Sequence, residues 1–100
     1  MAKYVLLYLG GSQPKSPEEG KKVMDAWMAW FGRVGSGVVD GGAPFGPRKT
    51  VGTGTAVTGA VGYSIVTASN LDAAIKLTDG HPHIASGGAI EVCETAPIAM

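Results

Sequence analysis

Two neighbouring segments decide the fold of this chain: MDAWMAWFGRV at Met24–Val34 and VVDGGAPFG at Val38–Gly46. Within and just before the first, apolar side chains recur at the spacing of one helix face. This apolar stripe consists of Val23, Trp27, Trp30, Phe31 and Val34. In the second, a short β-branched run ends at an acidic residue followed by two glycines, which is typical of a strand that leads into a turn. The sequence therefore predicts an aromatic helix face close to an acidic strand end.

The predicted helix has clear boundaries. Ser16 precedes Pro17, which suits the first helical position because its missing N–H would have no partner there. Glu19 stands three residues after Ser16, in the position that completes a capping box. Gly35 and Gly37 interrupt the pattern at the other end. We expect the helix to begin at Pro17 and to end before Gly35.

Four further segments have the composition of β-strands. They are Tyr4–Leu9, Gly37–Gly41 with a continuation at Lys49–Val51 after the Pro44–Pro47 bend, Tyr63–Ala68, and Ala89–Thr95. The last of these alternates, with Ile90 and Val92 on one face and Glu91 and Cys93 on the other. The segment Gly52–Gly59, rich in glycine and threonine, is expected to form a flexible hairpin.

A second helix is expected after Ser69 or Asn70, which suit its N-cap. Its predicted inward side chains are Leu71, Ala74, Ile75 and Thr78. Asp79-Gly80 should end this helix, and the His81-Pro82-His83 segment that follows should prevent its continuation.

The predicted element order is β-α-β-β-α-β, the ferredoxin-like plan of an α+β domain, and residues 1–100 are expected to form one domain. Two helices can cover only one face of its four-stranded sheet. We expect the other face to carry Tyr4, Leu6 and Tyr8, and an apolar face of that size needs a partner. Two such sheets packed together would give a homodimeric α+β barrel with a cleft between the sheet and the helix ends.

The overall charge argues against a nucleic-acid partner. Eight basic residues are balanced by eight acidic ones, and no basic stripe is available to neutralise phosphates. The single cysteine, Cys93, fits a reducing compartment. The short apolar run at Tyr4–Leu9 is a strand pattern and neither a signal peptide nor a membrane span, so we expect a cytoplasmic protein without a membrane partner.

Asp40 and the two histidines are the candidate catalytic residues. Asp40 stands at a strand end, where a carboxylate can act as a general base or can bond to the backbone of its own turn. His81 and His83 follow the second helix, where an imidazole can transfer protons or can stabilise the helix end. Asp40 with either histidine would form an acid–base pair.

Four residues are candidates for contact with a ligand: Tyr8, Trp27, Trp30 and Lys49. The tryptophans suit the apolar wall of a pocket or the core, and Lys49 suits either an anion or solvent. Cys93 fits a buried small side chain better than a nucleophile. The spacing of the histidines is weak evidence for a metal, and the glycines match no dinucleotide or P-loop motif, so no metal and no cofactor are predicted.

Five segments together resemble the YCII-related, or DGPF-like, family. They are Tyr4–Tyr8, the Trp27 and Trp30 pair, Val39–Gly46, Gly62–Ile65 and Gly87–Val92. The resemblance spans essentially the whole chain and implies a dimeric α+β barrel, with a cleft for which a His–Asp pair has been proposed as catalytic in one branch. This chain lacks the helix histidine of that branch, and Gly41–Phe45 matches its Asp-Gly-Pro-Phe signature only loosely.

Three functions remain open from the sequence. The first is a small homodimer whose pocket binds an organic molecule and performs acid–base chemistry with Asp40 and His83. The second is a non-catalytic module that senses or carries a metabolite. The third is structural assembly alone. The fold does not separate them, because one scaffold supports many functions.

Overall fold

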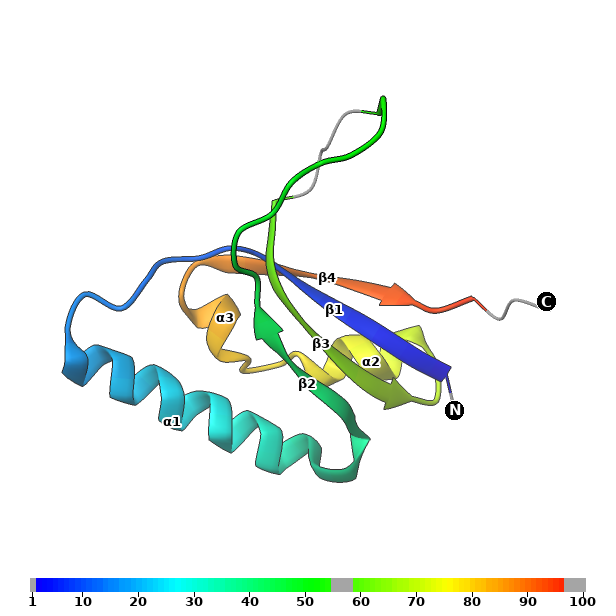
Figure 1. Ribbon diagram of the computed structural model, residues 1–100. Coiled ribbons are helices and arrows are strands. Elements are labelled where there is room, and N and C mark those ends of the chain that lie inside the picture. The colour runs from blue at the N-terminus through cyan, green and yellow to red at the C-terminus, as the bar shows by residue number, and fades with distance from the viewer. Residues whose placement is uncertain (1, 55–58, 97–100) are drawn as a thin grey trace.

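The computed structural model describes residues 2–54 and 59–96, which form one four-stranded antiparallel sheet with helices on one side (Figure 1). The strands are β1 (Ala2–Gly10), β2 (Val38–Pro44), β3 (Ala60–Ala68) and β4 (Gly88–Glu94). The helices are α1 (Pro17–Val34), α2 (Leu71–Leu77) and α3 (Pro82–Ala85), and a 3-10 turn at Gly35–Gly37 follows α1. The predicted ferredoxin-like α+β order is confirmed, with α3 as an additional short helix.

The sheet order is β2-β3-β1-β4, so the two strands at the centre are β3 and β1. Each neighbouring pair is antiparallel. Near the end of β1, Leu9 lies opposite Ala60 of β3 and Ala89 of β4. This end of the sheet faces the loop that leads into α1 and borders the cleft that forms the candidate functional site.

The N-terminus of α1 is capped as the sequence predicts. The side chain of Ser16 accepts a hydrogen bond from the Glu19 amide at 3.1 Å, and Pro17 occupies the first helical position. At the other end, Gly35 has a positive φ of 61°, and its amide donates to the Phe31 carbonyl. Helix α1 thus has the length that the sequence predicts, and four residues of its apolar stripe pack on the core, namely Trp27, Trp30, Phe31 and Val34.

The side of the sheet that carries Tyr4, Leu6 and Tyr8 is the covered one, so the expectation that these residues form the open face is wrong. All three are buried in one cluster with Trp30 of α1. Their large side chains fill the space under the helices, and the hydroxyl of Tyr8 finds polar partners there. The open face instead carries the other residues of the same strands, among them Val5, Leu7, Tyr63, Ile65 and Cys93.

The second helix follows Asn70, whose side chain accepts from the Ala73 amide at 2.8 Å. Ala74 and Thr78 are buried as predicted. Leu71 and Ile75 are 43% and 46% exposed, so their predicted inward orientation is wrong. The helix is only seven residues long, and Leu77 takes the position against the core that was expected of Ile75.

Strand β2 runs on to Pro44, and its last link to β3 is the hydrogen bond from the Phe45 amide to the Val61 carbonyl at 2.8 Å. Lys49–Val51 forms no strand, so the predicted continuation is wrong. Proline has no amide hydrogen, so Pro47 cannot contribute a donor to a ladder. Residues 55–58 of the predicted Gly52–Gly59 hairpin lie outside the described residues.

Within residues 2–54 and 59–96, every helix is too short or too polar to span a bilayer.

Candidate functional site

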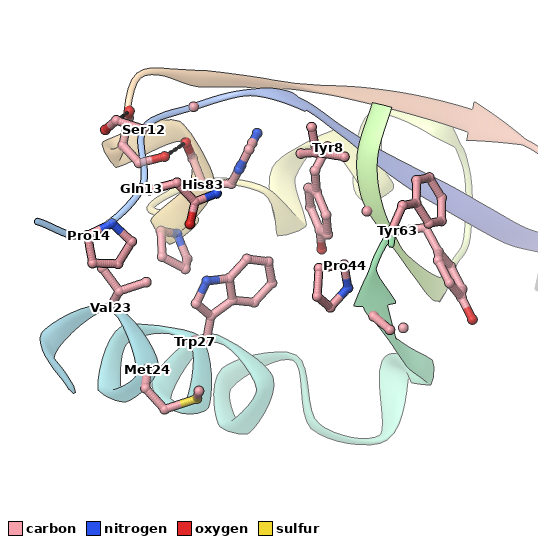
Figure 2. Close-up of a pocket in the computed structure, with 18 of the residues that line it drawn as sticks. Tyr8, Ser12, Gln13, Pro14, Val23, Met24, Trp27, Pro44, Tyr63 and His83 are labelled. Carbon is pink, nitrogen blue, oxygen red and sulfur yellow. Dashed lines mark hydrogen bonds between the residues drawn. The ribbon is translucent and has the colours of Figure 1, made fainter. Parts of the chain in front are cut away.

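An open cleft of about 680 Å³ lies between α1, the loop that follows β1, and the neighbouring ends of β2, β3 and α3 (Figure 2). Much of its lining is apolar or aromatic, including Val23, Met24, Trp27, Phe31, Phe45 and Val61. Polar groups come from the loop after β1 and from α3, among them Ser12, Gln13, His83 and Ser86. An apolar cleft with a few placed polar groups is the usual form of a small-molecule site.

The two tryptophans have different roles. Trp30 is 2% exposed, and its indole N–H donates to the Leu77 carbonyl at 2.8 Å, so it is a core residue that ties α1 to the end of α2. Trp27 is half-buried and lines the cleft, with its ring edge-on to Tyr8 at a centroid distance of 5.2 Å. Figure 2 shows Trp27 pointing from α1 into the cleft toward the sheet. The sequence leaves both roles open for the two tryptophans, and the structure places Trp30 in the core and Trp27 at the cleft.

His83 combines a fixed orientation with a free acceptor. Its Nε2 lies 2.9 Å from the carbonyl oxygen of Leu9. Because a carbonyl only accepts, Nε2 carries the hydrogen, and Nδ1 of the neutral ring is left with a lone pair. Nδ1 has no hydrogen-bond partner among the described residues, while the side chain lines the cleft. The ring can therefore take a proton at Nδ1 without losing its bond to Leu9.

Two glycines make room for this ring. A Cβ atom added at Gly88 would lie 2.3 Å from Nε2 of His83, and one added at Gly11 would lie 2.9 Å from its Cε1. Gly11 also has a positive φ of 90°, which side chains rarely adopt. The imidazole is thus held against backbone at the end of β1 and the start of β4.

His81 is fully buried, and both of its ring nitrogens have partners inside the protein. Its Nδ1 accepts a hydrogen bond from the His83 amide at 3.0 Å, where it caps α3, so its Nε2 carries the hydrogen and lies 3.2 Å from the hydroxyl oxygen of Tyr8. The pKa of His81 is lowered from 6.5 to about 4, mainly by burial and also by the nearby charges of His83 and Arg33. His81 is therefore a neutral structural residue at pH 7, and both of its nitrogens are occupied.

A chain of buried hydrogen bonds continues from His81 across the sheet. The Tyr8 hydroxyl donates to Oγ of Ser64 at 2.6 Å, and Ser64 donates to the Gly41 carbonyl at 2.8 Å. Burial raises the pKa of Tyr8, although its bond to Ser64 opposes this shift. These contacts fix the Tyr8 ring as one wall of the cleft.

Asp40 forms no hydrogen bond with His81 or His83, all three of which lie in the described part of the chain. Its Oδ1 accepts from the Gly42 amide at 2.8 Å, and its Oδ2 accepts from the Tyr63 hydroxyl at 3.3 Å. The negative charge of Asp40 and this hydrogen bond raise the pKa of Tyr63. Tyr63 belongs to the open face of the sheet and also borders one end of the cleft, where Figure 2 shows its ring pointing away from Tyr8. Asp40 thus makes the turn contacts that were one of its two predicted roles.

Arg48 is a cleft residue that sequence reasoning missed in favour of its neighbour Lys49, which does not line the cleft. The Nη1 of Arg48 donates to the Ala60 carbonyl at 2.7 Å, and its Cζ lies 5.8 Å from the centre of the Phe45 ring. The signal available in the sequence was the Phe45–Arg48 spacing beside two prolines, which allows an arginine to fold back on an aromatic ring.

Cys93 lies half-buried on the open face of the sheet, away from the cleft. Burial and the neighbouring Glu91 raise the pKa of its thiol. A thiol with a raised pKa is a poor nucleophile, which agrees with the structural role predicted for it. Among the described residues, no three His, Cys, Asp or Glu side chains come together as a metal site would require.

Comparison with known proteins supports the fold. A solved structure of 5-chloro-2-hydroxyhydroquinone dehydrochlorinase (TftG) from Burkholderia phenoliruptrix AC1100, in complex with 2,5-dihydroxybenzoquinone, matches with a TM-score of 0.52 and 17% sequence identity. The match covers 89% of this chain and 90% of the other. No protein-family model matches the chain, and no curated protein matches it either. The resemblance to the YCII-related family is therefore supported only as far as a shared fold.

Proposed function

We propose that this chain binds a small hydroxylated aromatic molecule in the cleft and that His83 accepts a proton or a hydrogen bond from it at Nδ1. The observation that carries the proposal is the geometry of His83: Nε2 is bonded to the Leu9 carbonyl at 2.9 Å, while Nδ1 has no partner among the described residues. A base held in this way keeps its orientation whether or not it is protonated.

The walls of the cleft support an aromatic ligand. The rings of Trp27 and Tyr8 meet edge-to-face with their centroids 5.2 Å apart, and the centroid of the His83 ring also lies 5.2 Å from that of Tyr8. Met24, which is 62% exposed on α1, adds a polarizable side chain at the rim. A flat ring placed beside Trp27 would bury apolar area while its hydroxyl group reaches the imidazole.

The solved neighbour supports the same chemical class. It is a dehydrochlorinase of a hydroxylated chlorinated ring, and it was solved with a hydroxylated quinone. Dehydrochlorination removes a proton as well as chloride, so a base at the ring is useful for that kind of reaction. We propose the same class of ligand for this chain, and the alternative is a module that binds such a molecule without transforming it.

The Asp40–His83 pair that the sequence predicts has no contact to support it, because the carboxylate of Asp40 is bonded to Tyr63 and Gly42. The proposal therefore gives the proton-accepting role to His83 alone. A catalytic role for Asp40 stays a prediction, as does the cytoplasmic location.

We also propose the homodimer that the sequence predicts, now through the corrected open face. Val5, Leu7, Tyr63, Ile65 and Cys93 lie half-buried there, and all helices of the described chain pack on the opposite face. A face of this composition on a chain of zero net charge suits a second copy of itself.

The test uses hydroquinone, an uncharged ring with two hydroxyl groups, and follows binding by NMR across pH. In the wild type, we expect the affinity to fall as the imidazole of His83 becomes protonated, because Nδ1 then no longer accepts. His83→Gln keeps a donor toward Leu9 but does not titrate, so its affinity should be independent of pH over the same range. An equally pH-dependent affinity in His83→Gln would contradict the role of His83. No binding at millimolar concentration would contradict the aromatic ligand.

A further inference from the structure

The permanent charge in the described lining of the cleft is positive. Among the described residues that line it, none is an aspartate or glutamate, and Arg48 is the residue with a permanent charge. An arginine cannot lose its proton in a protein, so this charge is present at every working pH. The lining therefore offers a cation to a ligand, while Asp40, whose carboxylate is bonded to Gly42 and Tyr63, is not itself a lining residue.

Arg48 is held in place before any ligand arrives. One of its N–H donors is bonded to the Ala60 carbonyl at 2.7 Å, and its guanidinium lies against the ring of Phe45. Phe45 in turn stacks on Tyr63 at a centroid distance of 5.9 Å. A guanidinium has five N–H donors in a fixed fork, so most of them remain for a carboxylate or an oxyanion.

Arg48 and His83 are anchored on adjacent strands at the same end of the sheet. Arg48 is bonded to the carbonyl of Ala60, and His83 is bonded to the carbonyl of Leu9. Leu9 and Ala60 lie opposite one another in the β1–β3 pairing. Both side chains also line the same cleft, so one ligand bound there can be offered both groups.

We propose, resting on the proposed function, that the cleft selects a hydroxylated aromatic anion, with the negative group held by Arg48 and a ring hydroxyl directed at Nδ1 of His83. The two side chains bind opposite ends of the ligand, and Trp27 contacts its ring. Arg48 is thus a residue that determines specificity for charge, while His83 determines the position of the hydroxyl.

The experiment compares 4-hydroxybenzoate with 4-hydroxybenzamide, which have nearly the same shape but differ in charge. In the wild type at low salt, we expect 4-hydroxybenzoate to bind about tenfold or more tightly than the amide, as is typical of a charge-assisted hydrogen bond. Arg48→Gln should weaken the benzoate to the level of the amide and leave the amide unchanged. Lys49→Gln removes the same charge from the adjacent residue outside the cleft, and both affinities should stay within about twofold.

The outcomes separate the two proposals. Equal affinity of the wild type for both probes, with resonances of Trp27 and His83 shifted by each, would overturn charge selection and leave the aromatic site intact. An equal loss of benzoate affinity in Lys49→Gln and Arg48→Gln would also overturn it, since the effect would then be general electrostatics. No binding of either probe would overturn both proposals. The comparison of 4-hydroxybenzoate with 4-hydroxybenzamide uses the wild type alone, so it tests charge selection even if Arg48→Gln is poorly folded.

Discussion

The imidazole of His81 accepts a hydrogen bond from the backbone amide of His83 at 3.0 Å, so a buried histidine orients the one that faces the cleft. The two rings differ in what they can do. His81 uses both nitrogens inside the protein, whereas His83 uses only Nε2. The first is therefore suited to support and the second to chemistry, although they stand two residues apart in the sequence.

Protonation of His81 should destabilise the fold in acid. The groups facing its ring are the Tyr8 hydroxyl, His83 and the Arg33 cation. Its pKa is about 4 in the folded state, below the ordinary value of 6.5, so the unfolded chain binds the proton more readily. The stabilisation is fully present above about pH 6.5 and is lost as the pH falls toward 4, with a total on the order of 3 kcal/mol.

Urea denaturation from pH 8 to pH 4 measures this effect. The control is His81→Asn, which can still cap α3 but does not titrate. The free energy of unfolding of the wild type should fall more steeply with acidification than that of the variant. Parallel pH profiles for the two proteins would show that His81 does not contribute.

Trp30→Ala should cost about 3–5 kcal/mol of unfolding free energy, because it removes a buried ring. Trp30 also bonds to the Leu77 carbonyl, so Trp30→Phe should cost less but leave that carbonyl without its indole donor.

Trp27→Ala, at a half-buried cleft position, should cost less unfolding free energy than Trp30→Ala and should weaken hydroquinone binding. Thermal denaturation and ligand titration check these effects, and similar stability losses for Trp27→Ala and Trp30→Ala would contradict the assigned roles.

Gly88→Ala should displace the His83 ring, because the added Cβ would lie 2.3 Å from Nε2. We expect the bond to Leu9 to break and ligand binding to lose its dependence on the protonation of His83. Gly32→Ala is the matched control: a Cβ at Gly32, in α1, meets no atom within 4 Å and should stabilise the helix by about 1 kcal/mol. NMR of the His83 imidazole is the measurement, and an unchanged ring environment in Gly88→Ala would contradict the prediction.

The homodimer should depend on the open sheet face. Leu7→Glu places a charge at its centre and should shift the protein toward a monomer in light scattering at micromolar concentration. Val51→Glu adds the same charge at a position that is 87% exposed, outside any strand, and should leave the assembly unchanged. The total buried area of such an interface should exceed about 1,000 Å². A wild type that is monomeric under these conditions would rule the dimer out.

Much of the fold was predictable because local patterns agree with it. The stripe from Val23 to Val34 and the cap at Ser16 fix α1, and the strand patterns fix the element order. The face of β1 was not predictable, because Val5 and Leu7 are as apolar as Tyr4 and Leu6. What decides it is tertiary: the Tyr8 hydroxyl finds Ser64 and His81 only on the helix side.

The site was predictable in part for the same reason. His83, Tyr8 and Trp27 line one cleft, and sequence patterns had named all three as candidates. Asp40 does not line that cleft. The register of β2 against β3 shifts on both sides of Asp40, and the sequence pattern gives no sign of these shifts, so the direction of its side chain was not predictable. Arg48 was missed because its position depends on a fold-back onto Phe45 and Ala60 across a loop.

The most direct test of the central claim is nitrogen NMR of the His83 imidazole, before and after hydroquinone is added at a pH where the ring is neutral. The account predicts that the free protein carries the hydrogen on Nε2, and that the ligand shifts the Nδ1 resonance while the Nε2–H bond to Leu9 persists. A ring with its hydrogen on Nδ1, or an Nδ1 resonance that saturating hydroquinone does not move, would contradict the assignment of His83 as the acceptor in the cleft.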